Sequence, residues 1–142
     1  MPSFISHKYK LIFCHIPRTG GTSFYEAIKP YLDKVNIDLQ QHTPLRALQI
    51  GQTRKIFNEY TKVSIVRDEK DRFESLGKGP PRFNTRPTDD YWWGTKRWLC
   101  DCEGNMLADV LLKFEELPGC AIEFLKSIGI EITEFPHLNA SK

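Results

Sequence analysis

The chain of 142 residues is long enough for one compact domain, and its 40% hydrophobic and 27% charged content is that of an ordinary globular protein. This composition excludes a disordered or fibrous chain. Because 20 Lys and Arg residues against 18 Asp and Glu residues leave a net charge of only +2, the whole surface is not suited to binding nucleic acid or an anionic membrane. Recognition of anions is therefore expected to be local.

The N-terminus and the cysteines bear on the compartment of the protein. No window approaches the ~20 apolar residues of a membrane span, and the first residues, MPSFISHKYK, lack the apolar region of a secretory signal. Cys100 and Cys102 are too close for a relaxed disulfide, and no second pair of metal ligands lies near them in the sequence. We expect reduced thiols, no bound metal, no membrane anchor and a cytoplasmic location, with a redox role for this pair as the alternative.

The first predicted elements alternate between strand and helix. Residues 10–16 form a short apolar run of strand length, which Pro17 ends. A loop over residues 17–23 leads into a helix that extends to about Leu32 and that Thr22 or Ser23 can cap. The next predicted elements are a helix over residues 45–60, a strand over 62–66 and a helix over 70–76 with Asp68 as its cap.

The second half of the chain begins with a Gly-, Pro- and Arg-rich stretch, residues 77–90, which is predicted to be a long loop. The elements predicted after it are a helix over 91–98, a turn over 101–105, a strand over 108–114 and a helix over 118–128 that Gly129 ends. This alternation predicts a single α/β domain over residues 1–142, with an open parallel sheet covered by helices on both faces. Ligands of such sheets bind at the carboxyl ends of the strands.

The strand-to-helix junction over residues 15–23, HIPRTGGTS, has the composition of an anion site. Gly20 and Gly21 let the backbone turn sharply and approach a ligand, and the N-terminus of the following helix offers N–H groups and partial positive charge. Arg18 adds a cation, while Thr22 and Ser23 add hydroxyl groups. A tight turn alone would explain the glycines but needs neither the arginine nor the hydroxyls. Because the cation precedes the glycines, the pattern differs from G-x-x-x-x-G-K-[ST] and disfavours a magnesium-dependent NTPase.

Four stretches together resemble the carbohydrate sulfotransferases, the family that includes the heparan and chondroitin/dermatan uronyl enzymes. Residues 15–23 resemble their 5′-phosphosulfate loop, H-x-P-K/R-T-G-G-T-S, and residues 63–75, VSIVRDEKDRFES, are similar to their 3′-phosphate motif, V-R-(N/D)-P-x-x-R-x-x-S. Residues 109–117, DVLLKFEEL, resemble the motif D-x-x-x-R/K-F-E-x-L, and residues 136–142, PHLNASK, resemble the C-terminal motif H-x-N-x-S/K. The resemblance thus extends over essentially the whole chain.

This resemblance implies the P-loop-like sulfotransferase fold, with 3′-phosphoadenosine-5′-phosphosulfate (PAPS) as donor, 3′,5′-adenosine bisphosphate as product, and no metal requirement. The donor-binding residues that it implies are Arg18, Thr19, Gly20, Gly21, Thr22, Ser23, Arg67, Ser75, Asn139 and Ser141. Arg67 follows a predicted strand, where its guanidinium can bind a phosphate with two N–H groups. The alternative is that Arg67 and its neighbours form exposed ion pairs, since Asp68 and Arg72 are i,i+4 partners. Where the family often has Pro, this chain has Glu69.

Sulfuryl transfer requires the acceptor oxygen and the leaving phosphate to lie roughly in line, and it requires stabilisation of charge on the leaving oxygen. Arg18 is suited to the second task. The base cannot be identified from residue types alone, but residues 41–48, QHTPLRAL, are similar to the family motif K/Q-H-x-x-x-R-x-L, whose histidine lies beside the acceptor hydroxyl. The resemblance therefore implies His42 as base, with a structural histidine as the alternative, whereas His15 is expected to brace the phosphate loop.

The three tryptophans of the chain are Trp92, Trp93 and Trp98, and residues 78–97 carry five basic residues against two acidic ones. Aromatic faces stack on sugar rings, and cations suit anionic sugars. We therefore predict an acceptor groove that includes Arg82, Arg86, Trp92 and Trp93, and a hydroxyl acceptor that is in the first place a carbohydrate. In the alternative interpretation the tryptophans fill the core. Two other functions remain open: a P-loop kinase of a small molecule and a catalytically silent nucleotide-binding module.

Overall fold

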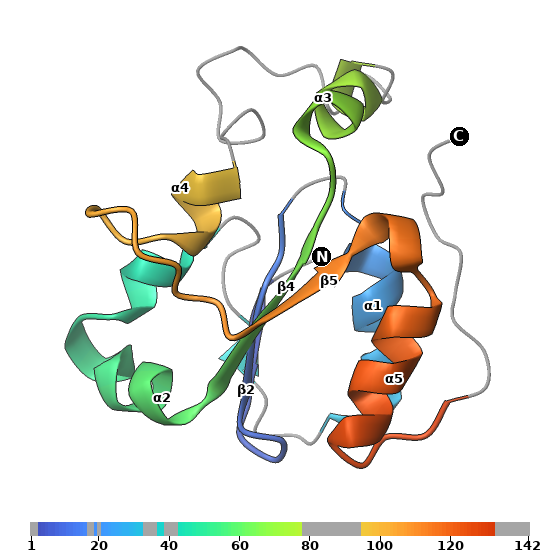
Figure 1. Cartoon of the computed structure of the whole chain (residues 1–142). Coiled ribbons are helices and arrows are strands. Elements are labelled where there is room, and N and C mark those ends of the chain that lie inside the picture. The colour runs from blue at the N-terminus through green and yellow to red at the C-terminus, as the bar shows by residue number, and fades with distance from the viewer. Residues whose placement is uncertain are drawn as a thin grey trace.

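The computed structural model of the protein describes residues 3–16, 19, 21–32, 37–38, 43–77 and 95–132 (Figure 1). Its strands are β1 (Phe4–Ser6), β2 (Leu11–Cys14), β3 (Ile37–Asp38), β4 (Thr61–Val66) and β5 (Val110–Lys113). Its α-helices are α1 (Gly21–Ile28), α2 (Arg54–Glu59), α3 (Glu69–Gly77), α4 (Thr95–Leu99) and α5 (Gly119–Ser127). Short 3-10 helices occur at Lys29–Tyr31, Leu45–Leu48, Gly51–Thr53 and Phe114–Glu116.

The strands form one mixed sheet in the order β3-β1-β2-β4-β5. β2, β4 and β5 are parallel, as predicted, but β1 is antiparallel to both β2 and β3. The prediction of a wholly parallel sheet is therefore wrong. β1 and β2 are separated only by residues 7–10, and so short a connection permits a hairpin but no crossover.

The sheet has a hydrophobic core on each face, as expected for an open α/β architecture. In Figure 1, α1 and α5 cover one face, while α2 and α4 lie on the other. Alternate strand residues point to opposite faces. The strand residues in the first core are Phe4, Leu11, Phe13, Val63, Ile65 and Leu112, and they pack against Phe24 and Ile28 of α1 and Leu125 of α5. The second core contains Ile5, Ile12, Cys14, Leu45, Leu48, Phe57, Trp98 and Leu99.

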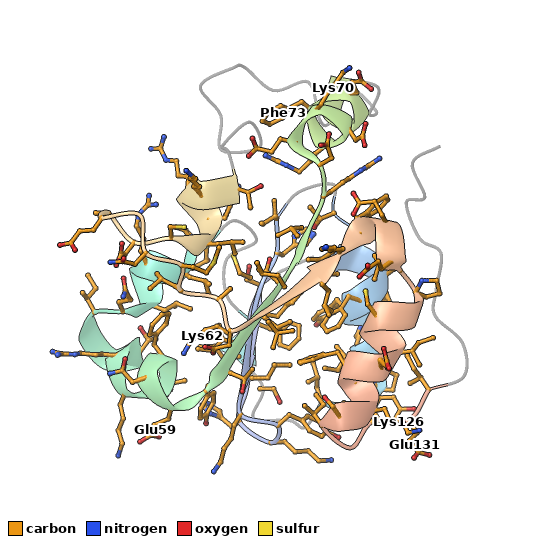
Figure 2. The ribbon with its side chains drawn as sticks, viewed as in Figure 1. Glu59, Lys62, Lys70, Phe73, Lys126 and Glu131 are labelled. Carbon is orange, nitrogen blue, oxygen red and sulfur yellow. The ribbon has the colours of Figure 1, made fainter. Side chains whose placement is uncertain are left out.

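One β4 residue on the second face is a lysine. Lys62 points toward α2 (Figure 2), where its ammonium group donates to the carbonyl of Phe57 at 2.9 Å and pairs with Asp109 at 3.3 Å. The Asp109 carboxylate also accepts the backbone N–H of Lys62 at 2.9 Å. The buried cation is therefore neutralised and hydrogen-bonded, as burial of charge requires.

The prediction of one continuous helix over residues 45–60 is wrong. The chain instead forms two 3-10 turns before α2. Gly51 has a φ of 70°, which is incompatible with a right-handed helix, and the hydroxyl of Thr53 donates to the carbonyl of Leu48 at 2.9 Å. The glycine and this side-chain bond divide the segment, although Leu45, Leu48 and Phe57 are still buried in the second core.

The other boundaries agree closely with the pattern of the sequence. Asp68 caps α3 by accepting the N–H of Asp71 at 3.2 Å, and Gly129, with a φ of 95°, ends α5. The strand predicted over residues 108–114 is shorter, because a 3-10 turn begins at Phe114. Within the residues that the structure describes, no helix has the length and apolar character needed to cross a membrane.

Candidate functional site

The junction after β2 is held in place from inside the fold. The buried hydroxyl of Thr19 donates to the carbonyl of Ile16 at 2.8 Å. At the beginning of the junction, the backbone N–H of His15 donates to the buried hydroxyl of Ser3, just before β1, at 2.9 Å. α1 begins at Gly21. The start of this junction is therefore anchored at His15 to the residue before β1, and Thr19 is bonded back to Ile16.

Aromatic packing fixes the direction in which α1 leaves the junction. Phe24 of α1 stacks on Phe13 of β2, with ring centres 4.7 Å apart, and Ser23 is buried beside it in the first turn. His15 is buried as well, with its ring 6.4 Å from that of Phe13. The bracing of the phosphate loop by the His15 side chain stays a prediction.

Arg67 leaves β4 and lies over the ring of Phe114, which follows β5. The parallel register pairs Val66 with Lys113, so the next residues along the two strands are brought side by side. The guanidinium carbon lies 4.1 Å from the ring centre, well within the range of a cation–π contact. A guanidinium can bind a phosphate with two parallel hydrogen bonds, which is the role expected of Arg67.

A side-chain hydrogen bond joins the last residue of β2 to the second half of β4. The buried hydroxyl of Ser64 in β4 donates to the carbonyl of Cys14 in β2 at 2.7 Å. Because the two strands are parallel neighbours, the junction after β2 and Arg67 after β4 leave the sheet at the same edge (Figure 1). Two of the regions predicted to bind anions therefore start from adjacent strand ends.

α3 carries a fully buried arginine next to an exposed carboxylate. Arg72 has no exposed surface, and its guanidinium lies 4.7 Å from the ring centre of Phe73. Burial lowers the pKa of Arg72, and the negative charge of Glu69 opposes this shift. The alternative interpretation placed Arg72 in an exposed ion pair with Asp68, and its burial contradicts that location.

α4 is fastened at both ends to elements near the candidate site. At its start, the carboxylate of Glu69 accepts the N–H of Thr95 at 2.6 Å. Near its end, the guanidinium of Arg46 donates to the carbonyl of Arg97 at 2.7 Å. Trp98 is fully buried in the second core, so this tryptophan fills the interior, as the alternative interpretation expected.

All four cysteines are free. Cys14 is buried, and its thiol donates to the carbonyl of Thr43 at 3.5 Å. Burial raises the pKa of Cys14 to about 12, which leaves essentially no thiolate at neutral pH and argues against a nucleophilic role. Cys100 is buried too, whereas Cys102 is exposed. In the part of the chain that the structure describes, His, Cys, Asp and Glu side chains form no cluster that could hold a metal ion.

Many of the predicted site residues lie outside the described residues, and their roles stay predictions. They are Arg18, Gly20, His42, Arg82, Arg86, Trp92, Trp93, Asn139 and Ser141. For Thr22 in α1 and Ser75 in α3 the structure describes a helical backbone. Thr19, Ser23 and Arg67 are the predicted donor-binding residues whose side chains it describes.

Two residues beside the predicted site make contacts that their sequence motifs do not indicate. Phe114 belongs to the stretch that resembles D-x-x-x-R/K-F-E-x-L, but its contact with Arg67 depends on the pairing of β4 with β5. Glu69 stands where the family often has proline. A carboxylate at the first position of a predicted helix indicates a hydrogen-bond acceptor there, but the sequence does not reveal that Thr95 is its partner.

No protein-family model, curated protein or solved structure matches the chain. The functional assignment therefore depends on the sequence motifs and on the geometry at the carboxyl edge of the sheet.

Proposed function

We propose that the protein is a sulfotransferase with the P-loop-like sulfotransferase fold, which moves a sulfuryl group from PAPS to a hydroxyl of an acceptor, in the first place a carbohydrate. The observation that carries the proposal is the location of two candidate anion sites, the junction after β2 and Arg67 after β4, at neighbouring ends of parallel strands. PAPS has a 5′-phosphosulfate and a 3′-phosphate, so it needs two separate anion sites. The order of the four sequence motifs supports the same donor.

The proposed donor site divides between these two regions. The junction of residues 15–23 binds the 5′-phosphosulfate through Arg18 and the backbone of the two glycines, and the start of α1 adds favourable N–H groups. Because the hydroxyl proton of Thr19 is engaged by Ile16, Thr19 contributes through its backbone N–H. Arg67 and Ser75 bind the 3′-phosphate, while Asn139 and Ser141 complete the nucleotide site.

The proposed reaction is an in-line transfer. The acceptor hydroxyl attacks sulfur, a new oxygen–sulfur bond forms, and the bond between sulfur and the phosphate oxygen breaks. The hydroxyl proton passes to His42, because a neutral imidazole is the side chain most often used as a general base near neutral pH. The electron pair of the broken bond leaves with 3′,5′-adenosine bisphosphate, where Arg18 stabilises the new charge. Arg82, Arg86, Trp92 and Trp93 bind the acceptor, and no metal takes part.

Calorimetry with two nucleotides tests the donor site. We expect 3′,5′-adenosine bisphosphate to bind at least tenfold more tightly than 5′-AMP without metal, because each charge-assisted contact to the 3′-phosphate contributes about 1.5–3 kcal/mol. Arg67→Ala should abolish this preference, whereas Arg54→Ala, an exposed arginine on α2, should leave it intact. A 3′-phosphate contribution below about 1 kcal/mol would contradict the assignment of Arg67.

Turnover separates the sulfotransferase from the other two functions. Transfer of labelled sulfate from PAPS to a panel of polysaccharides should occur with the wild type and fall sharply in His42→Ala at saturating donor. Magnesium-dependent binding of ATP in preference to the bisphosphate would favour the kinase. Tight binding of the bisphosphate without transfer to any acceptor would favour a silent nucleotide-binding module.

A further inference from the structure

The peptide group between Cys14 and His15 is hydrogen-bonded to a serine hydroxyl on each side. On the β4 side, the hydroxyl of Ser64 donates to the carbonyl of Cys14 at 2.7 Å. On the β1 side, the hydroxyl of Ser3 accepts the N–H of His15 at 2.9 Å. This carbonyl and this N–H belong to one planar peptide unit. Because β2 lies between β1 and β4 in the sheet, the two serines hold the same peptide from opposite sides.

The held peptide marks the point where β2 leaves the sheet. The antiparallel ladder with β1 ends at Phe13, and the parallel ladder with β4 ends at Cys14. His15 therefore lies beyond the paired residues of both ladders, and its N–H is bonded to a side chain. The Ser3 hydroxyl thus extends the hydrogen bonding of β2 by one residue, up to the start of the junction.

The residues that form this arrangement are all buried. Ser3, Cys14, His15 and Ser64 each expose at most 5% of their surface, so water has little access to replace a broken bond. Rotation of the planar peptide would break both bonds and leave buried polar groups without partners, which is costly. The two serines therefore fix the orientation of this peptide, and with it the direction in which the chain enters the junction.

The described part of the junction continues from this peptide in defined contacts. The carbonyl of Ile16 accepts the hydroxyl of Thr19 at 2.8 Å, and α1 begins at Gly21. Phe24 of α1 then stacks on Phe13 of β2, with ring centres 4.7 Å apart. The direction set at the start of the junction is thus matched to a helix that packs back on the same strand.

We propose that Ser3 and Ser64 are positioning residues, which fix the Cys14–His15 peptide and thereby the approach of the junction to the 5′ group of the nucleotide. This inference rests on the proposed function, which assigns the 5′-phosphosulfate to the junction after β2. Both hydroxyls are buried and bonded to the backbone, so they act through the peptide and not by contact with the nucleotide. Because Arg67 follows a different strand, the serines should affect recognition of the 5′ group separately from that of the 3′-phosphate.

Ser6 provides a matched control in the same strand as the residue after Ser3. Its side chain is fully buried, and its hydroxyl accepts the N–H of Tyr9 at 3.2 Å, at the opposite end of β1 from the junction. Ser3→Ala and Ser6→Ala each remove a serine hydroxyl that accepts a backbone N–H. Each should raise the equilibrium constant for unfolding by about five- to hundredfold. A difference between them in nucleotide binding therefore reports position and not stability.

Calorimetry below the thermal transition compares 3′,5′-adenosine bisphosphate with 3′-AMP, which lacks the 5′ group. Ser3→Ala and Ser64→Ala should each bind the bisphosphate about three- to tenfold more weakly than the wild type, because the junction is no longer oriented in advance. Both variants should bind 3′-AMP with unchanged affinity. Ser6→Ala should match the wild type with both nucleotides.

Two results with these nucleotides would overturn the proposal. Equal weakening for the bisphosphate and 3′-AMP would give the serines a purely structural role, and wild-type affinity in Ser3→Ala would show that the junction does not depend on its bond. If the wild type itself bound neither nucleotide, the proposed function would be contradicted, and with it the nucleotide part of this inference.

Amide chemical shifts decide the structural part without any nucleotide. The cross-peaks of His15 and Ile16 should move in both Ser3→Ala and Ser64→Ala, because a bond to either end of a peptide group polarises the other end. They should stay in place in Ser6→Ala. An unmoved His15 cross-peak in Ser64→Ala would refute the joint action of the two serines on this peptide.

Discussion

Arg67 lies over the ring of Phe114, and this contact restricts the conformations of a long side chain. When a phosphate binds a guanidinium that is already oriented, less side-chain entropy is lost on binding. In the proposed donor site, the ring of Phe114 would thus aid phosphate binding without touching the phosphate.

Replacing Phe114 should therefore weaken binding of the 3′-phosphate in particular. We expect Phe114→Leu to lower the affinity for 3′,5′-adenosine bisphosphate about three- to tenfold, since a partly exposed cation–π contact contributes about 0.5–1 kcal/mol and can exceed that when desolvated. Phe114→Tyr keeps a ring and should bind like the wild type. Calorimetry with 5′-AMP provides the control, because a loss of equal size for both nucleotides would mean general damage to the site.

At the level of single residues, the sequence predicts locations better than contacts. The sequence places Arg67 at the end of a strand, because the apolar run that predicts this strand directly precedes it in the chain. Its contact with Phe114 depends on the register between β4 and β5. The hydrogen bond from the Thr95 N–H to the Glu69 carboxylate likewise joins two separate helices. No local pattern contains either relationship, so the structure was needed to find both.

Among the elements, the turn over residues 101–105 combines backbone hydrogen bonds with three bonds to one carboxylate. Asp101 accepts the N–H groups of Glu103 and Asn105, each at 2.9 Å, and the side-chain amide of Asn105 at 3.1 Å. Gly104, with a φ of 87°, completes the turn. The bonds from Asn105 and the other backbone N–H groups lower the pKa of Asp101, so the folded state favours its ionised form.

This lowered pKa gives the turn a defined dependence on pH. Stability from the ionised Asp101 is fully present above the unfolded pKa of about 3.9 and is lost as the pH falls through the lower folded pKa. The wild type should therefore have a higher Tm than Asp101→Asn at pH 7, and the difference should narrow below about pH 4. Glu103→Gln, in the same turn, should show no such convergence. Thermal unfolding followed by circular dichroism measures both, and a constant difference would contradict the role of the charge.

Elements with strong periodicity or clear caps were predictable, and weakly marked ones were not. β4, α3 and α5 follow from an apolar run, an aspartate cap and a terminal glycine. β1 and β3 have only three and two residues, too few for any period to be recognised. The apolar spacing over residues 45–60 correctly indicated which residues are buried. The prediction of one helix was wrong because Gly51 interrupts the helical backbone.

For the whole molecule, one sheet separates two cores, and its strands contribute side chains to both. Loss of packing on one face should therefore lower the stability of the whole sheet. Leu48 lies in the second core and Leu125 in the first, and both are buried.

We expect Leu48→Ala and Leu125→Ala each to lower the free energy of unfolding by about 2–5 kcal/mol. Urea denaturation should give coincident transitions by tryptophan fluorescence and far-UV circular dichroism in both variants, because the sheet unfolds as a unit. Ile50→Ala, at a position 74% exposed, should change stability by less than about 0.5 kcal/mol. Separate transitions for the two probes would show instead that the faces melt independently.

The order of the strands also governs how quickly this chain can reach its native state. The β1–β2 hairpin closes over a few residues and can form within about 1–10 μs. The central pairs are different, because the bond from Ser64 to Cys14 joins residues 50 apart and the bond from Lys62 to Asp109 joins residues 47 apart. Each must close a large loop before it gains any contact energy, and such high contact order slows folding. The strand ends that are proposed to hold the nucleotide are thus brought together late in folding. We therefore expect a newly synthesised chain to become able to bind nucleotide only after these distant strands have paired.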